Sequence, residues 1–179
     1  MYESPDGAWI VAIDKDNDEV VFVEPGARGN ASSVAHTVAA SEDHCALDDQ
    51  SGCGGKPDKV AFHSRQDGST DFFFSFTSPQ DRQGTDGIGY INSKEIEAGQ
   101  KTLHHVGGGS GASKYRAIRA GGGYVATIMA YPFEGVMLVD ADADAEDAKL
   151  NVATVKTNEG PSRVLYVPRD ATGAYCENA

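Results

Sequence analysis

The chain has 179 residues, enough for one substantial hydrophobic core, and a formal net charge of −12. This charge leaves no basic stripe to neutralise phosphates, so we expect neither nucleic acid nor an anionic membrane surface as a partner. No apolar run reaches the length of a membrane span, and we expect no membrane insertion. The acidity itself is typical of a well-solvated surface.

The first unit of the chain covers residues 1 to about 40. Gly7 closes a turn before an apolar run at residues 8–13, and a second apolar run begins twelve positions after that glycine. Short apolar runs bounded by Gly, Asp, Asn and Pro indicate β-strands. A third strand is predicted at residues 33–39. We expect this unit to lack the strand that would precede Gly7.

A Gly- and Asp-rich insert at residues 41–57 leads into the second unit, at about 58–107. Its glycine turn is at Gly68. Apolar stretches before and after this turn predict four strands, which begin near positions 60, 69, 88 and 102. A long polar turn separates the second and third of them.

The third unit, at about 113–157, resembles the first. Gly123 precedes one apolar run, and a second run again begins twelve positions later. A fourth unit at 161–179 holds only two predicted strands around Gly173. The glycine turns therefore recur every fifty to sixty residues, and a repeat of this period is typical of propellers and solenoids.

Four short strands per repeat predict an all-β fold made of β-propeller blades, each blade a four-stranded antiparallel sheet. The alternative is an ordinary antiparallel sandwich with regular strand spacing. About three and a half blades cannot close a ring. We therefore expect the chain to be a segment of a longer propeller, or one of several pieces that complete a ring.

Two cysteines of the insert, Cys45 and Cys53, are predicted to form a disulfide that closes this loop. Such a bond implies an oxidising compartment, which makes the protein extracellular or periplasmic. Two alternatives remain open. The thiols could be reduced, or they could bind zinc together with His36 and His44, although the paired spacing of known zinc modules is missing.

Three carboxylates alternate along the turn between the first two strands, at Asp14, Asp16 and Asp18. Oxygen ligands at this spacing suit calcium, which is the one candidate cofactor. The same spacing recurs at residues 140–144. The glycine and the bidentate glutamate of an EF-hand loop are absent, so plain hydrophilic turns are the alternative.

His63 and Arg116 lie on the first predicted strands of the second and third units. In a propeller these strands line the central channel. A histidine and an arginine that meet there could act as a general base and as an oxyanion partner, which makes this pair the candidate catalytic site. Ordinary polar strand residues are the alternative.

Residues 4–12 (SPDGAWIVA) and 18–23 (DEVVFV) resemble the blade core of YVTN-type propellers. Residues 160–170 and 174–178 are similar to the blade start of lactonase-like seven-bladed propellers. The resemblance implies the propeller fold, with seven blades in the complete ring. Its members include sugar lactonases, propeller subunits of redox enzymes, and purely binding or surface-layer propellers. No catalytic motif of these relatives maps onto the chain.

Two functional hypotheses follow. The first is a non-catalytic extracellular propeller segment that binds a protein partner, or another part of the same propeller, and so builds an assembly. The second is part of a lactonase-like or redox enzyme with a channel site around His63 and Arg116.

Overall fold

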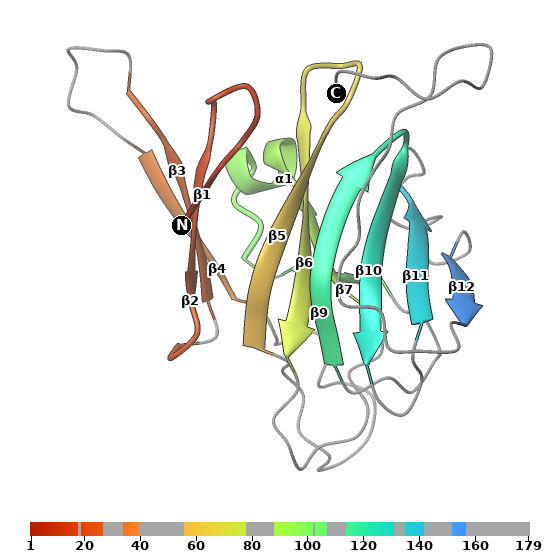
Figure 1. The fold of residues 1–179 in the computed structure, drawn as a ribbon. Coiled ribbons are helices and arrows are strands. Elements are labelled where there is room, and N and C mark those ends of the chain that lie inside the picture. Colours follow the sequence, from red (N-terminus) through yellow and green to blue (C-terminus); the bar gives the residue numbers. More distant parts are fainter. Residues whose placement is uncertain are drawn as a thin grey trace.

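The structure is a computed structural model that describes residues 1–17, 19–26, 34–39, 56–77, 88–101, 103–106, 114–130, 135–141 and 152–156. Within these residues the fold is all-β, and every pair of neighbouring strands is antiparallel (Figure 1). The strands form three consecutive meanders. Each meander pairs its strands in chain order.

The first meander is a four-stranded sheet in the order β1-β2-β3-β4. Its strands are β1 (Tyr2–Glu3), β2 (Ile10–Asp14), β3 (Glu19–Glu24) and β4 (Val34–Ala39). The expectation that this unit lacks its first strand is wrong, because Tyr2 pairs with Val11 and Glu3 pairs with Ile10. A strand of 2 residues is too short to show an alternating apolar pattern. Only its pairing with β2 reveals it.

The second meander contains β5 (Lys56–Ser64), β6 (Thr70–Thr77), β7 (Ile88–Asn92) and β8 (His104–Val106). The third contains β9 (Lys114–Gly121), β10 (Tyr124–Ala130), β11 (Gly135–Asp140) and β12 (Val152–Lys156). A single ladder pair, Thr77 with Lys114, joins these two meanders into one 8-stranded sheet. Neither sheet of the described residues closes on itself.

One short helix, α1 (Ser93–Glu97), interrupts the second meander and was not predicted. Asn92 caps it by accepting a hydrogen bond from the backbone N–H of Lys94, while the Glu95 side chain accepts from the backbone N–H of Asn92. This reciprocal arrangement is a capping box, which satisfies backbone donors at the start of a helix. A helix of 5 residues is too short to show a 3.6-residue apolar period.

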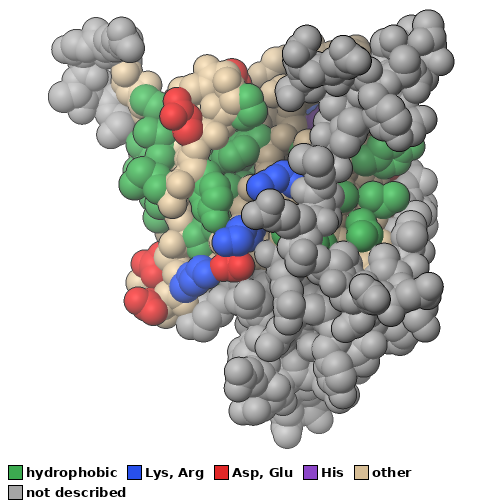
Figure 2. Space-filling view, in the orientation of Figure 1, with side chains coloured by type: hydrophobic (Ala, Val, Ile, Leu, Met, Phe, Trp, Pro, Cys, Tyr) green, Lys and Arg blue, Asp and Glu red, His purple; other side chains and the backbone are tan. Residues whose placement is uncertain are grey.

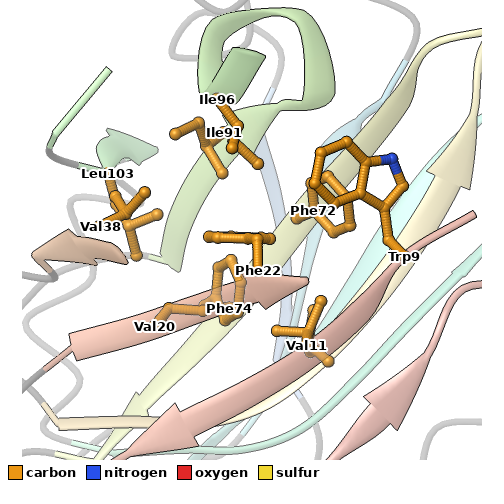
Figure 3. Close-up of a cluster of buried hydrophobic side chains, with 11 residues drawn as sticks. Trp9, Val11, Val20, Phe22, Val38, Phe72, Phe74, Ile91, Ile96 and Leu103 are labelled. Carbon is orange, nitrogen blue, oxygen red and sulfur yellow. The ribbon is translucent and has the colours of Figure 1, made fainter. Parts of the chain in front are cut away.

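The hydrophobic core consists of two clusters, one on each side of the second meander. Strand β6 supplies both, because consecutive side chains of a strand point to opposite sides. Phe72 and Phe74 pack against the first meander, and Phe73 packs against the third. Figure 3 shows the cluster shared by the first and second meanders, in which Phe22 and Phe72 have ring centroids 4.9 Å apart.

The turn before the second strand of each meander provides a common reference point. The N–H of Ser4 donates to the carbonyl of Trp9, the N–H of Arg65 donates to the carbonyl of Ser69, and Gly121 pairs with Tyr124. The equivalent positions that close the three turns are therefore Trp9, Ser69 and Tyr124. The first turn is one residue longer than the second. Residues at the same distance after Gly7 and after Gly68 therefore point to opposite sides of their sheets.

This reference defines two sides of every meander. The leading side of a meander is the side onto which the residue after the reference position points. These residues are Ile10, Thr70 and Val125. The opposite side is called the trailing side. The trailing side of the first meander packs on the leading side of the second, through Phe22 and Phe72 for example. The trailing side of the second packs on the leading side of the third in the same way. Both interfaces between meanders thus join a trailing side to the leading side of the next meander.

The predicted strands of the first three units are confirmed wherever the structure describes them. The fourth predicted unit, at 161–179, lies outside the described residues. The arrangement of these units in a propeller ring stays a prediction.

Candidate functional site

A buried carboxylate, that of Asp71 in β6, lies at the centre of a polar network within the second meander. Its side chain is fully buried. It accepts hydrogen bonds from Arg65 Nε at 2.6 Å, from the Tyr90 hydroxyl at 2.8 Å and from Asn92 Nδ2 at 2.6 Å. The three donors come from the turn before β6 and from β7. The carboxylate therefore ties together two strands and the turn that precedes them.

The charges of this network determine the ionisation of its members. Burial raises the pKa of the Tyr90 phenol, and the adjacent Asp71 carboxylate raises it further. Burial would lower the pKa of Arg65, but its hydrogen bond to Asp71 and the charge of that carboxylate hold it above its usual value. The phenol thus stays protonated, and the guanidinium stays charged, over the physiological pH range.

The network continues to the strand β8 through helix α1. Glu95 Oε1 lies 2.6 Å from Nε2 of His104, and Glu95 Oε2 caps the helix. Burial alone would raise the pKa of Glu95, but the hydrogen bonds from His104 and from the Asn92 backbone hold it below its usual value. The ring of Tyr90 packs on His104, with centroids 6.0 Å apart. Polar contacts therefore connect β6, β7, α1 and β8.

This arrangement is suited to holding strands in register rather than to reacting with a substrate. The acceptor oxygens of Asp71 are used by three protein donors, and the hydroxyl that lies against it is held in its protonated form. A buried charge with all its partners in place also opposes any slip of the strands, since a shifted register would leave it unpaired.

The candidate catalytic pair is only partly placed. His63 lies in β5, directly opposite Asp71 in the ladder, and its side chain is partly buried. Arg116 lies in β9, but its side chain is outside what the structure describes. The two strands do pack against each other. The pair therefore stays a prediction.

In the predicted calcium loop, Asp14 serves the turn itself. Its Oδ1 accepts hydrogen bonds from the backbone N–H groups of Asp16 and Asn17, at 3.0 and 3.2 Å, and its Oδ2 accepts from the side chain of Asn17. Such local bonds are typical of Asp in turns. Asp18 lies outside the described residues, within which no three His, Cys, Asp or Glu side chains form a metal-binding group. Calcium binding stays a prediction.

The predicted disulfide between Cys45 and Cys53 lies outside the described residues, as does His44. His36, the other histidine of the zinc alternative, is in β4, with Nε2 4.0 Å from Glu24 and its ring 6.2 Å from that of Trp9. This histidine packs among side chains of the first meander. No helix among the described residues is long and apolar enough to cross a membrane.

The leading side of the first meander is an apolar surface. Its two cross-strand rows run from Ile10 through Val23 to Ala35 and from Ala12 through Val21 to Thr37. These residues are partly or largely exposed, and none belongs to either core cluster of the described residues. Hydrophobic side chains are visible over the first meander at the left of Figure 2. The equivalent sides of the other two meanders are covered by a neighbouring sheet.

The trailing side of the third meander is also apolar. Val136 and Leu138 of β11 are partly exposed, and Tyr124 at the reference position is 56% exposed. At the other end of β10, near a bulge, Ile128 is fully buried. The open part of this side is therefore the end near Tyr124.

Sequence reasoning missed both the Asp71 network and the two apolar end surfaces. A carboxylate next to a run of three phenylalanines was the available signal for the network, since a charge in a buried strand needs partners. The comparisons with known proteins do not supply a relative that could assign these sites. No family model, no curated protein and no solved structure matches the chain.

Proposed function

We propose that the chain contributes consecutive blades to a β-propeller and acts as a non-catalytic module that binds protein or builds an assembly outside the cytoplasm. The proposal rests on the way in which the sides of neighbouring meanders meet. Each trailing side packs on the next leading side, as a radial repeat of blades requires. In a simple sandwich there would instead be a single core, formed between the inner sides of two sheets.

The contacts between first strands add support. The Tyr2 hydroxyl of β1 donates to the carbonyl of Asp58 in β5 at 3.2 Å, and Asp58 also forms an ion pair with Lys15 of the first meander. Strand β5 in turn packs against β9. The first strands of neighbouring meanders are thus in contact, which is their relation around the channel of a propeller.

The end surfaces explain why assembly is the proposed role. A large exposed apolar patch on a protein marks an interaction site. At one end of the described stack the apolar residues Val21 and Val23 are partly exposed, and at the other end Tyr124 is 56% exposed. Each of these surfaces matches a side that forms an interface between described meanders. The extracellular or periplasmic location rests separately on the predicted Cys45–Cys53 disulfide.

Sedimentation of the purified 179-residue chain tests the proposal. We expect a folded species of defined stoichiometry that is larger than the 18.9 kDa monomer. A folded chain that stays monomeric over the whole accessible concentration range would contradict an assembly role. The measurement is repeated with reductant, because loss of the predicted disulfide should change the insert and leave the three meanders assembled.

A channel enzyme is the second candidate, and one observation favours it. His63 lies in β5, which packs against β9, the strand that carries Arg116. A lactonase-like activity would require both side chains. The test is hydrolysis of a panel of sugar lactones by the wild type and by His63→Ala. Turnover that the substitution abolishes, without loss of folding, would establish this candidate.

A further inference from the structure

We infer that the leading side of the first meander docks a second copy of the chain, which presents the trailing side of its third meander. The inference rests on the proposed function and names the partner and the surfaces. Both interfaces inside the chain join a trailing side to a leading side. Among the described residues, one side of each kind is not packed against another meander: the leading side of the first and the trailing side of the third. A contact that again joins a trailing side to a leading side therefore brings the third meander of one copy onto the first meander of another.

The equivalence of Trp9 and Tyr124 indicates how the second copy is held. Trp9 projects from the trailing side of the first meander and meets Phe72 on the leading side of the second, with ring centroids 5.8 Å apart and planes at 82°. Tyr124 occupies the same position on the third meander but is 56% exposed. Aromatic side chains that become buried on binding are frequent energetic centres of protein interfaces.

On the first meander, a small residue occupies the position that would face this aromatic ring. The position equivalent to Phe72, three residues after the reference, is Ala12, whose cross-strand neighbour is Val21. A small residue there leaves space for a ring from outside the chain. The neighbouring Ile10–Val23 pair extends the apolar surface. The carboxylates on this side, Glu3 and the Asp14–Glu19 pair, lie at its margins.

This contact is heterologous, since two different surfaces of the same chain meet. Heterologous contacts generate rings when the rotation closes and open filaments when it does not. The net charge of −12 opposes association at low ionic strength. Apolar docking should therefore strengthen when salt is raised, whereas a contact held by ion pairs would weaken.

The experiment compares three variants by analytical ultracentrifugation at physiological and high salt. Val21→Lys places a charge on the leading side of the first meander, and Tyr124→Lys places one on the trailing side of the third. Each should weaken association about tenfold or more. The matched control is Val34→Lys, which changes the same residue type in the same meander at a position that is 52% exposed and on the other side.

Mixing the first two variants distinguishes the proposed geometry from a symmetric contact. The Val21→Lys chain keeps its Tyr124 surface, and the Tyr124→Lys chain keeps its Val21 surface. The mixture should therefore form a dimer that neither variant forms alone and that cannot grow further. No complementation in the mixture would overturn the head-to-tail geometry.

The outcomes also separate this inference from the proposed function. Assembly of the wild type that Val21→Lys leaves unchanged would overturn the docking surface but leave the assembly role standing. A wild type that is monomeric throughout would overturn both. Near-ultraviolet circular dichroism of each variant verifies that the sheets are intact, so that loss of assembly is not loss of folding.

Discussion

Replacing Asp71 with Asn tests whether the buried network holds the second meander together. The substitution keeps the size of the side chain and removes the charge, so Arg65 Nε loses an ionised acceptor 2.6 Å away. The amide also presents hydrogens toward Asn92 Nδ2, which is itself a donor. The Tyr90 hydroxyl donates to the same Oδ1 atom as Asn92 and loses its acceptor with it. All three hydrogen bonds to the carboxylate are thus weakened or lost.

The expected cost follows from the burial of the two partners. Asp71 is completely buried, whereas the Arg65 side chain is 21% exposed and can regain some hydration. Breaking a buried ion pair by removing one partner typically costs about 3–5 kcal/mol. We expect the lower end, about 3 kcal/mol of the free energy of unfolding, because Arg65 is partly solvated.

Urea unfolding followed by tryptophan fluorescence measures this cost. Trp9 is the only tryptophan in the chain and packs on Phe72, the neighbour of Asp71. Asp67→Asn is the control, since its ion pair with Lys94 is exposed, and we expect little change there. A loss below about 1 kcal/mol for Asp71→Asn would refute the reasoning. So would strict additivity with Arg65→Gln, because residues that share an interaction should couple.

Three further predictions concern the core, the helix cap and the insert. Phe72→Ala should cost about 3–5 kcal/mol in urea unfolding, because it leaves a cavity between the first two meanders, and an unchanged midpoint would contradict their packing. The pKa of Glu95 is lowered in the folded protein, so its ionised side chain stabilises the fold. This stabilisation is complete at pH values above 4.5, the ordinary pKa of the side chain, and is lost as the pH falls through the lowered pKa. Glu95→Gln should therefore destabilise the protein at neutral pH, with a difference that shrinks in acid unfolding curves, and a difference that grew in acid would contradict this sign. Alkylation under native conditions followed by mass spectrometry should leave Cys45 and Cys53 unmodified until reductant is added, whereas modification without reductant would exclude the disulfide.

The strand pattern was predictable because it is local. Alternation of apolar residues and the turns around Gly7, Gly68 and Gly123 depend on neighbours in the chain, and these glycines do have positive φ angles, of 70°, 81° and 79°. Helix α1 escaped prediction for the converse reason. Its capping box stabilises a segment too short for a periodic signal.

The candidate sites were harder to predict because they join distant residues. Nothing near Asp71 in the sequence indicates that Tyr90 and Asn92 are its donors, since that depends on the register of β6 against β7. The calcium prediction treated Asp14 as an available ligand. In the folded turn, however, its oxygens accept hydrogen bonds from Asp16 and Asn17.

The sequence by itself determined where the strands lie and that they recur as units of similar size, because alternation and turn chemistry act over a few residues. Only the tertiary structure decided which side of each meander faces its neighbour. A one-residue difference between the first and second turns reverses the apparent side of every following residue, and hydrogen bonds across the turns are needed to resolve it. That assignment identifies Trp9 and Tyr124 as equivalents, one buried between meanders and the other exposed at the end of the stack.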